Sequence, residues 1–430
     1  GGYKWGASMT RTNSALGLGF RPSNIKNLDI KWETQEQINV GIDLGFLDNR
    51  INLVVDAYIK KSADMLMMLN LPSIMGTQGN GSSSLQAPWG NYGNIENKGL
   101  EIALNTRPVQ SKNFDWSSDF QISFNKNKLK SLSGSTALLG TGQWTDVVAR
   151  SVPGESLYNF YGYEVEGIYQ NFDDIINSPV VELNSNPIIT DADGTKHWST
   201  NPADYKRANT TYVGDIKYKD VNGDGVINEN DRTNIGSPLP KFTFGWNNTF
   251  RYKDFDLNIF INGSYGNKVG NYMKMKLTRM KTAWENQLVD VKDRSVLVPV
   301  DGVYSTAWYD NVANVKVGNP GASLPRATLG QADYNSRWST RYIEDGSYIR
   351  LKTVTLGYTF NQKLLKSMGG FLTNLRLTVS ANNLLTITGY DGYDPEVGAS
   401  TSDANGYAYG VDNGRYPSPT TVTFGLSASF

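Results

Sequence analysis

Residues 420–430 at the end of the chain alternate strictly between apolar side chains and polar or small ones. One face carries Val422, Phe424, Leu426, Ala428 and Phe430, and the other carries Thr421, Thr423, Gly425, Ser427 and Ser429. Because successive side chains point to opposite faces of a β-strand, one face can meet hydrocarbon while the other meets a polar lumen. The pattern is typical of a membrane β-barrel strand. An amphipathic closing strand of a soluble sandwich is the alternative.

The same alternation recurs in pairs of segments that are joined by short turns. The pairs are residues 38–46 with 51–59, 100–104 with 114–124, 242–250 with 255–262, and 349–360 with 375–381. A change of phase near Thr353 predicts a bulge in the last pair. Short turns at one end of the hairpins and long loops at the other are typical of bacterial outer-membrane barrels.

The direction of each hairpin predicts where the chain ends. If the strands alternate down and up, Phe430 lies at the same end as the short turns, at the periplasmic rim, where aromatic girdle residues belong. About nine strands follow from this pattern. Two further strand-like segments, residues 157–170 and 213–218, form either one more membrane hairpin or an external excursion.

Length and composition narrow the class of protein. At 430 residues the chain is longer than most compact soluble domains, whereas a barrel grows by adding strands. Lys+Arg and Asp+Glu both total 41, so no charge imbalance favours nucleic acid. The sequence has no Cys, which excludes disulfides, and no apolar run long enough for a transmembrane helix. It begins Gly-Gly without a signal peptide, so we expect a mature chain or a C-terminal fragment.

Residues 220–231 carry oxygen-bearing groups in the spacing of an EF-hand loop. The candidate ligands are Asp220, Asn222, Asp224, the carbonyl of Val226, Asn228 and Asp231. Gly225 permits the sharp turn, and Asp231 replaces the usual final Glu, which leaves the choice between Ca²⁺ and Mg²⁺ open. The alternative is a turn cluster without metal. No helix pair is expected around the loop, so we interpret it as a structural clip within an extracellular insertion.

Catalytic patterns are sparse, and we do not expect an enzyme. The single His197 excludes most Ser-His-Asp and multi-histidine schemes. Residues 269–289 are expected to include a helix lying in a loop. The loops carry the tryptophans Trp89, Trp144, Trp198, Trp308 and Trp338. Aromatic rings beside hydrogen-bonding side chains suit sugar stacking and protein contacts equally. We take Trp89, Trp144, Trp308 and Trp338 as candidate substrate contacts.

Several segments, in order along nearly the whole chain from Lys26, resemble a known family. They are residues 28–44 with Asn49-Arg50, Tyr161-Gly-Tyr163, residues 166–169, 215–225, 231–238, 348–352, 380–385 and 392–396. These segments are similar to the TonB-dependent SusC/RagA transporters of Bacteroidetes. The resemblance implies an all-β transmembrane antiparallel barrel of about 22 strands, closed by a plug. Residues 1–430 would supply its C-terminal half, with roughly ten to twelve strands.

The resemblance also implies a function and partners. It implies multi-pass location in the bacterial outer membrane and import of oligomeric nutrients, oligosaccharides first and oligopeptides as the alternative. The implied partners are a SusD-like surface lipoprotein, TonB, and an N-terminal barrel and plug segment that this sequence does not show. A dimer of transporter–lipoprotein pairs is compatible with this interpretation. A secreted, Ca²⁺-stabilised β-rich carbohydrate-binding or hydrolytic protein is the alternative from another class, and it would be soluble without detergent.

Overall fold

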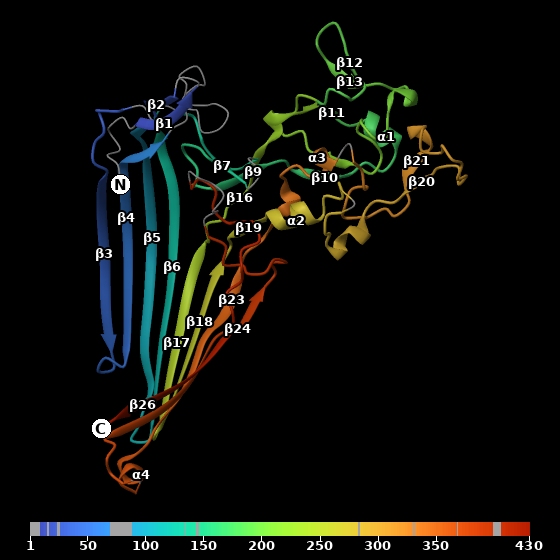
Figure 1. Ribbon diagram of the computed structural model, residues 1–430. Coiled ribbons are helices and arrows are strands. Elements are labelled where there is room, and N and C mark those ends of the chain that lie inside the picture. Colours follow the sequence, from blue (N-terminus) through green and yellow to red (C-terminus); the bar gives the residue numbers. More distant parts are fainter. Residues whose placement is uncertain are drawn as a thin grey trace.

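The computed structural model describes residues 9–14, 17–23, 26–68, 88–133, 135–142, 146–282, 284–329, 332–367, 369–398 and 406–430. Within these ranges, nine long strands form one antiparallel sheet (Figure 1). They are β3 (Thr34–Phe46), β4 (Ile51–Met68), β5 (Trp89–Gln110), β6 (Phe114–Leu132), β17 (Phe242–Tyr252), β18 (Phe255–Tyr265), β23 (Tyr348–Thr359), β24 (Asn374–Thr388) and β26 (Thr421–Ser429). Each strand pairs with its neighbours in this order, so the sheet is an up-and-down meander.

The predicted hairpins and the predicted position of the C-terminus are confirmed. The short turns that follow β3, β5 and β17 lie at the lower end of the sheet in Figure 1. The connection from β23 to β24 lies there too and holds the short helix α4 (Gln362–Ser367). Phe430 ends the chain at this same end, and its ring stacks on Phe371 from the β23–β24 connection.

The bulge expected near Thr353 is also present. The register between β18 and β23 shifts between Phe260 and Ile261, and the register between β23 and β24 shifts between Leu351 and Thr353. Lys352 is therefore an additional residue of β23 relative to β18, whereas β24 has one residue more than β23 at this point. A single extra residue moves the following side chains to the opposite phase, which explains why the apolar pattern changes at this position.

One face of the sheet is apolar from edge to edge. Antiparallel partners share a face, and the register aligns Ile42 with Val55, Val55 with Ile102, and Ile102 with Ile122. The same face continues to Val379, which pairs with Phe424. These side chains are open to the surroundings; Phe424 is 78% exposed. The sheet therefore presents a continuous apolar surface that no described part of the chain covers.

The opposite face of the sheet is polar and internally hydrogen-bonded. Asp256 in β18 accepts a hydrogen bond of 2.8 Å at Oδ2 from Nη2 of Arg376 in β24, across the intervening strand. Asn258 donates to Oδ1 of Asn247 at 2.8 Å. The two faces therefore differ in chemistry along the full width of the sheet, as the alternation predicts.

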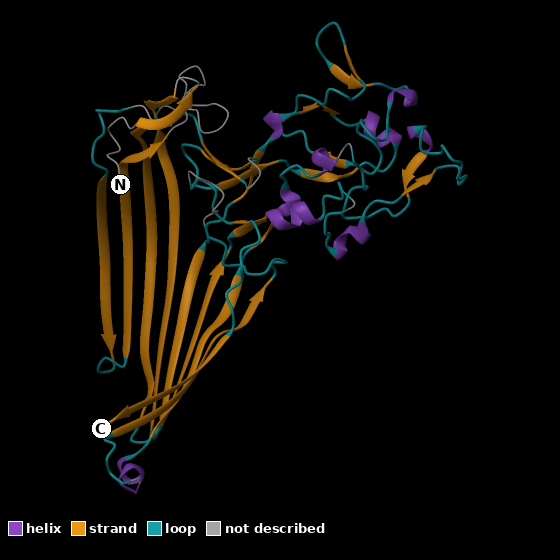
Figure 2. Cartoon of the chain, viewed as in Figure 1, coloured by secondary structure: helices purple, strands orange, loops and turns teal. Residues whose placement is uncertain are grey.

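Three long connections, residues 133–241, 266–347 and 389–420, lie beyond the upper end of the sheet in Figure 1, and we call their described part the loop body. Figure 2 shows that its strands and helices are short. Its strands are β7 (Leu138–Thr141), β8 (Val147–Ser151), β9 (Asn159–Gly162), β10 (Val165–Ile168), β11 (Val180–Val181), β12 (Ile188–Thr190), β13 (Lys196–Trp198), β14 (Ile216–Tyr218), β15 (Val226–Ile227), β16 (Thr233–Gly236), β19 (Lys268–Asn271), β20 (Leu297–Pro299), β21 (Val315–Val317), β22 (Ile343–Asp345) and β25 (Val411–Asp412). Its helices are α1 (Phe172–Ile176), α2 (Tyr272–Leu277) and α3 (Ala332–Asn335), with 3-10 turns at Pro202–Asp204, Glu229–Asp231, Val289–Asp293, Val312–Asn314 and Thr340–Tyr342. Near the other edge of the sheet, β1 (Met9–Ser14) pairs with β2 (Gly17–Pro22).

The loop body resolves the two segments that the sequence left open. Residues 157–170 form β9 and β10, and residues 213–218 form β14, and all three strands belong to small sheets of the loop body. These segments are an excursion and not a further hairpin of the large sheet. The sequence predicts ten to twelve barrel strands if these segments are included. Without them, the described sheet has nine strands. Among the described helices, none has the length and apolar character needed to cross a membrane.

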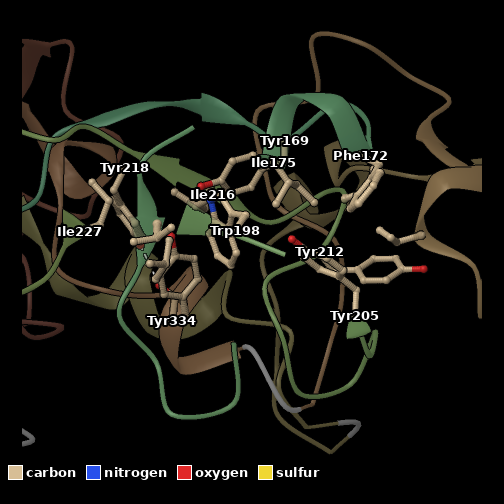
Figure 3. Packing of buried hydrophobic residues seen from close by; sticks show 14 of the residues in the cluster. Tyr169, Phe172, Ile175, Trp198, Tyr205, Tyr212, Ile216, Tyr218, Ile227 and Tyr334 are labelled. Atoms are coloured by element: carbon tan, nitrogen blue, oxygen red, sulfur yellow. Dashed lines mark hydrogen bonds between the residues drawn. The ribbon is translucent and has the colours of Figure 1, made fainter. Parts of the chain in front are cut away.

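The loop body has its own core, in which aromatic residues pack among isoleucines and valines (Figure 3). Tyr218 packs edge-on against Tyr334 with ring centroids 5.1 Å apart, and its hydroxyl donates to the Tyr334 carbonyl at 2.7 Å. Trp198 is buried, and its Nε1 donates to the Ser178 carbonyl at 3.0 Å. Tyr and Trp side chains can be buried in such a core because the hydrogen bonds of their polar atoms replace those made with water.

A buried ion pair fixes two distant segments of the loop body. Asp215 is 0% exposed and accepts hydrogen bonds from Arg326, at 2.8 Å from Nε and 3.0 Å from Nη2. Nδ2 of Asn335 donates to the same carboxylate at 2.8 Å. This contact joins the segment before β14 to the segment around α3. It therefore places Tyr334 and the residues that follow it.

A second ion-pair cluster joins two segments that carry the family resemblance. Arg350 in β23 is almost fully buried and contacts Oδ1 of Asp394 at 2.6 Å. It also pairs with Glu396, which accepts a hydrogen bond of 2.9 Å from the hydroxyl of Tyr348. Residues 348–352 and 392–396 are therefore in direct contact, and the last long connection is anchored to the sheet.

Candidate functional site

The loop body encloses a cavity of about 800 Å³ at the centre of several distant segments. It is lined by Asp146, Val147, Tyr163, Glu229, Arg232, Met275, Lys276, Leu277, Arg279, Glu285, Asn286, Ser336, Arg337 and Trp338. The expected helix within residues 269–289 is α2, which is shorter than the segment. It and the chain after it form one wall. Most of the lining residues carry charged or polar groups, which can orient a ligand by hydrogen bonds and charge.

Arg337 lies between two tyrosine rings at this cavity. Its guanidinium carbon is 5.1 Å from the centroid of the Tyr163 ring and 4.9 Å from that of Tyr334. Its Nη1 is buried and has no hydrogen-bond partner in the described part of the chain. A guanidinium that stacks on aromatic rings still offers its N–H groups in the plane to an acceptor.

Arg232, Glu229 and Tyr163 form a connected group on the same cavity. Arg232 Nη1 contacts Oε2 of Glu229 at 3.1 Å, and the hydroxyl of Tyr163 donates to Oε1 of Glu229 at 3.1 Å. Burial raises the pKa of Tyr163 to about 12, so its hydroxyl stays protonated. Burial alone would raise the pKa of Glu229, but the hydrogen bond from Arg232 and its charge outweigh burial and hold that pKa below its ordinary value. Glu229 is therefore ionised and already neutralised by Arg232.

A second cavity of about 650 Å³ uses the same stretch of chain after α2. Its basic lining residues are Arg207, Lys281, Arg294 and Arg326, and its described lining residues include no Asp or Glu. Arg207 lies 4.2 Å from the centroid of the Tyr309 ring. Residues 275–279 and 285–286 line the first cavity and residues 280–282 and 287 line the second, so one stretch of chain contributes to both.

The predicted tryptophans are spread over the structure. Trp338 is only 5% exposed; it lies among Phe160, Tyr272 and Tyr342, and it forms part of the wall of the first cavity. Trp308 is half-buried against the aromatic core, in edge contact with Tyr304 and Tyr309. Trp89 starts β5, and Trp198 is a core residue. Trp144 lies outside the described residues. Among those described, only Trp338 reaches the first cavity.

The arginines of the two cavities were not among the predicted site residues. They come from segments that are far apart in the sequence, around residues 207, 232, 279, 294, 326 and 337. No spacing rule connects such positions. One sequence signal points to this region. Tyr161-Gly-Tyr163 and Asp231-Arg232 both lie in segments that carry the family resemblance, but the sequence does not predict that they are in contact.

The loop at residues 220–231 is closed by hydrogen bonds between its side chains and its own backbone. Asp220 accepts from the backbone N–H of Gly223 at 2.7 Å and of Gly225 at 2.8 Å. Asp231 is fully buried and accepts from Val221 N at 3.0 Å and Asn228 N at 2.7 Å. The positive φ of Gly225, 81°, supplies the turn that the EF-hand spacing requires.

The donor set of this loop suits a hard cation, since all its candidate ligands are oxygens. Each carboxylate oxygen that accepts one N–H has a further lone pair. Asn222 and Asp224 are exposed, and Asn222 Nδ2 contacts Oδ2 of Asp224 at 3.0 Å. In the described residues, no three or more His, Cys, Asp or Glu side chains are grouped as a metal site. The loop therefore has suitable chemistry, and the cation stays a prediction.

The fold defines a class of protein: a partial β-barrel with one apolar and one polar face. A family model described as "TonB dependent receptor-like, beta-barrel" matches residues 5–179. The chain is 32% identical over 414 residues to TonB-dependent receptor P3 of Formosa agariphila, covering 95% of this chain and 35% of that protein. It is 25% identical over 408 residues to TonB-dependent receptor SusC of Bacteroides thetaiotaomicron, covering 94% of this chain and 32% of that protein.

A solved structure of the RagAB peptide transporter has the same fold, with a TM-score of 0.69 at 20% identity, over 100% of this chain and 39% of that one. The chain is related to the TonB-dependent receptors: their β-barrel family model matches its first part, and the two curated receptors match 94–95% of its length. It spans about a third of the length of the relatives that it matches. The predicted fold class and family are confirmed.

Proposed function

We propose that this chain forms part of the wall and the outer loops of a bacterial outer-membrane transporter that imports oligomeric nutrients. The observation that carries the proposal is the continuous apolar face of the nine-stranded sheet, opposite a polar face. In water such a face would be an aggregation surface, whereas in a bilayer it is the stable arrangement.

The orientation follows from the loops. Outer-membrane barrels have short periplasmic turns and long extracellular loops. The proposal therefore places the lower end of the sheet, with Phe430, at the periplasm and the loop body outside the cell. The cavities of the loop body then face the source of nutrients, and the polar face of the sheet lines the route inward.

The proposal includes partners. β3 and β26 are the outer strands of the described sheet, and an unpaired strand edge is unstable in hydrocarbon. We therefore include further barrel strands and a plug, from the same longer protein or a separate chain. TonB would supply energy from the periplasm, and a SusD-like lipoprotein would cover the loop body. Import in this scheme needs no covalent chemistry.

The cargo is an oligomer, and we place oligosaccharides first and oligopeptides second. The hydrophilic lining of the two cavities supports a hydroxyl-rich or charged ligand. Oligopeptides are the second class because the fold, at 20% identity, is similar to that of the RagAB peptide transporter.

Growth of the source bacterium on single oligomeric nutrients tests the function. We expect deletion of the gene to abolish growth on one cargo class and to leave growth on its monomers unchanged. We also expect the protein in detergent-solubilised outer membranes, with heat-modifiable migration on gels. Full solubility of the folded protein in buffer without detergent would contradict the proposal and favour a secreted β-rich protein.

For the loop at residues 220–231 we propose a structural Ca²⁺ or Mg²⁺ site. Asp220, Asn222, Asp224, the Val226 carbonyl, Asn228 and Asp231 would hold the ion. Such an ion would fix the connection between β14 and β16 close to Glu229 and Arg232, which line the first cavity. The support is the oxygen donor set and the backbone turn, and a test is given in the Discussion.

A further inference from the structure

The two cavities concentrate positive charge in a chain whose total formal charge is zero. Four basic and three acidic residues line the first cavity, and four basic residues line the second, of which only Arg326 has a described acidic partner, Asp215 behind the wall. A local excess of one sign in a partly enclosed, low-dielectric site raises the concentration of counter-charged ligands there. Because the chain as a whole is balanced, the excess belongs to these sites and not to general composition.

The acidic residues of the first cavity cancel the charge of Arg232 but not that of Arg337. Glu229 is occupied by Arg232 and by the hydroxyl of Tyr163. Asp146 accepts a hydrogen bond of 2.8 Å at Oδ2 from the hydroxyl of Tyr272. Glu285 is exposed at the edge. In the described part of the chain, Arg337 has aromatic contacts but no ion pair.

Arg337 supplies the uncompensated guanidinium for an anion, and Arg232, which is held by Glu229 and by the carbonyls of Val147 and Tyr161, lines the same cavity. Nη1 of Arg337 and Nε of Arg232 are both buried and lack a hydrogen-bond partner among the described residues. Both guanidinium groups lie against the Tyr163 ring, at 5.1 Å and 5.9 Å from its centroid. Stacking limits the movement of the guanidinium, so less freedom is lost when a carboxylate or sulfate binds its edge.

The second cavity, which shares the stretch of chain after α2 with the first, also has an arginine against a tyrosine ring. Arg207 lies against Tyr309, and no described ion pair involves Arg207 or Arg294. Both cavities have volumes in the range of about 300–1,000 Å³ that ligand pockets show. An oligomer with charges on successive units could occupy both.

We propose that the two cavities bind carboxylate or sulfate groups of an anionic oligomer, and that this oligomer is the cargo. The anion site is defined by Arg337 in the first cavity, where Arg232 is already paired with Glu229, and by Arg207 and Arg294 in the second. The identification of the ligand as cargo rests on the proposed import function, whereas anion binding itself does not.

Titration calorimetry on the full-length protein in detergent tests anion binding. The probes are a short oligogalacturonate, a sulfated oligosaccharide, an oligoglutamate peptide and a neutral malto-oligosaccharide of similar length. We expect at least one anionic probe to bind at least about tenfold more tightly than the neutral one. Which anionic probe binds decides whether the anion comes from an acidic glycan or an acidic peptide. Equal or tighter binding of the neutral probe would overturn the proposal.

Substitutions locate the binding. Arg337→Gln should weaken binding of the anionic probe by about tenfold or more, because a charge-assisted contact is lost. The double variant Arg207→Gln with Arg294→Gln tests the second cavity. It still tests the proposal if the Arg337→Gln protein does not fold. Lys219→Gln is the matched control: it removes one charge from an exposed pair with Glu164, outside both cavities. Unchanged affinity in both arginine variants, or equal loss in the control, would overturn the proposal.

Uptake by whole cells separates this inference from the proposed function. If the arginine variants lose anion binding but cells do not import the same oligomer, the anion site is supported and the proposed import function is contradicted. If cells import a neutral oligomer equally well with the arginine variants, and the protein binds no anionic probe, the import function is supported and the anion site is contradicted.

Discussion

The nine-stranded sheet and the loop body follow opposite rules of burial. The sheet leaves apolar side chains such as Ile38, at 69%, exposed, and its few buried apolar residues, such as Ile95 and Leu129, pack with residues of the loop body. The loop body buries its aromatic residues, such as Tyr212 and Tyr218. An apolar surface is stable only where the solvent is apolar. The difference therefore divides the molecule into a part that needs lipid and a part that folds like a soluble domain.

The largest expected effect breaks the loop body and spares the sheet. Asp215→Ala leaves the buried Arg326 without its partner and should cost about 3–5 kcal/mol of stability. Hydrogen exchange in the full-length protein should show faster exchange of the amides around β14, with the strands of the sheet unchanged. Lys219→Ala, which breaks only an exposed pair, is the control and should change little. Equal protection of the loop body in both variants would contradict the role of Asp215.

The next effect breaks the sheet and spares the loop body. Phe424→Arg places a charge on the apolar face in the middle of β26 and should cost about 2–4 kcal/mol in a bilayer. Thr423→Arg, one residue earlier on the polar face, is the matched control and should be tolerated. The measurement is equilibrium unfolding of the protein refolded into lipid vesicles. A similar cost for both variants would mean that the two faces meet the same environment.

The cation loop sharpens the comparison, because an ion would stabilise the loop body alone. Asp220→Ala with Asp224→Ala should lower its thermal stability and remove its response to a chelator. The expected loss is about 2.7 kcal/mol when the ion is present at 100 times its dissociation constant. Asp193→Ala, in the turn between β12 and β13, is the control because its carboxylate caps a similar turn. Thermal melts without any chelator response in the unmodified protein would rule out the ion.

The smallest effect is a local titration in the loop body. A hydrogen bond to Asp191, at 3.2 Å from Nε2, raises the pKa of His197 above its ordinary value of 6.5. The charged ring therefore favours the folded hairpin of β12 and β13 at low pH, and this contribution is lost as pH rises through the raised pKa. In an NMR titration, Asp191→Asn should lower the pKa of His197 towards its ordinary value, while the contact with the Trp198 carbonyl remains. An unchanged pKa in that variant would assign the shift to another group.

The sheet could be predicted from sequence because its rule is local. The period of two fixes which side chains share a face, so Val422 and Phe424 could be assigned before any pairing was known. The bulge at Lys352 was visible for the same reason, as a change of phase. The short turns then determined the direction of every strand and the position of Phe430.

The loop body could not be predicted in the same way. Arg337 lies against the Tyr163 ring and lines the same cavity as Arg232. Both residues are more than a hundred positions away in the sequence, and no repeating pattern relates these positions. Trp338 looked like a surface residue because it lies in a long polar loop, yet it is packed among aromatic rings. Non-local packing of this kind leaves no regular trace in the sequence.

Cysteine accessibility tests the central claim, that one face of the sheet meets lipid and the other a lumen. Residues 1–430 have no Cys, so Val379→Cys and Ser380→Cys in β24 can each be the single thiol, with any cysteine elsewhere in the full-length protein replaced by Ser. In native outer membranes, a small water-soluble maleimide should label the cysteine at position 380 and not the one at position 379. Labelling of both positions at similar rates would contradict the claim.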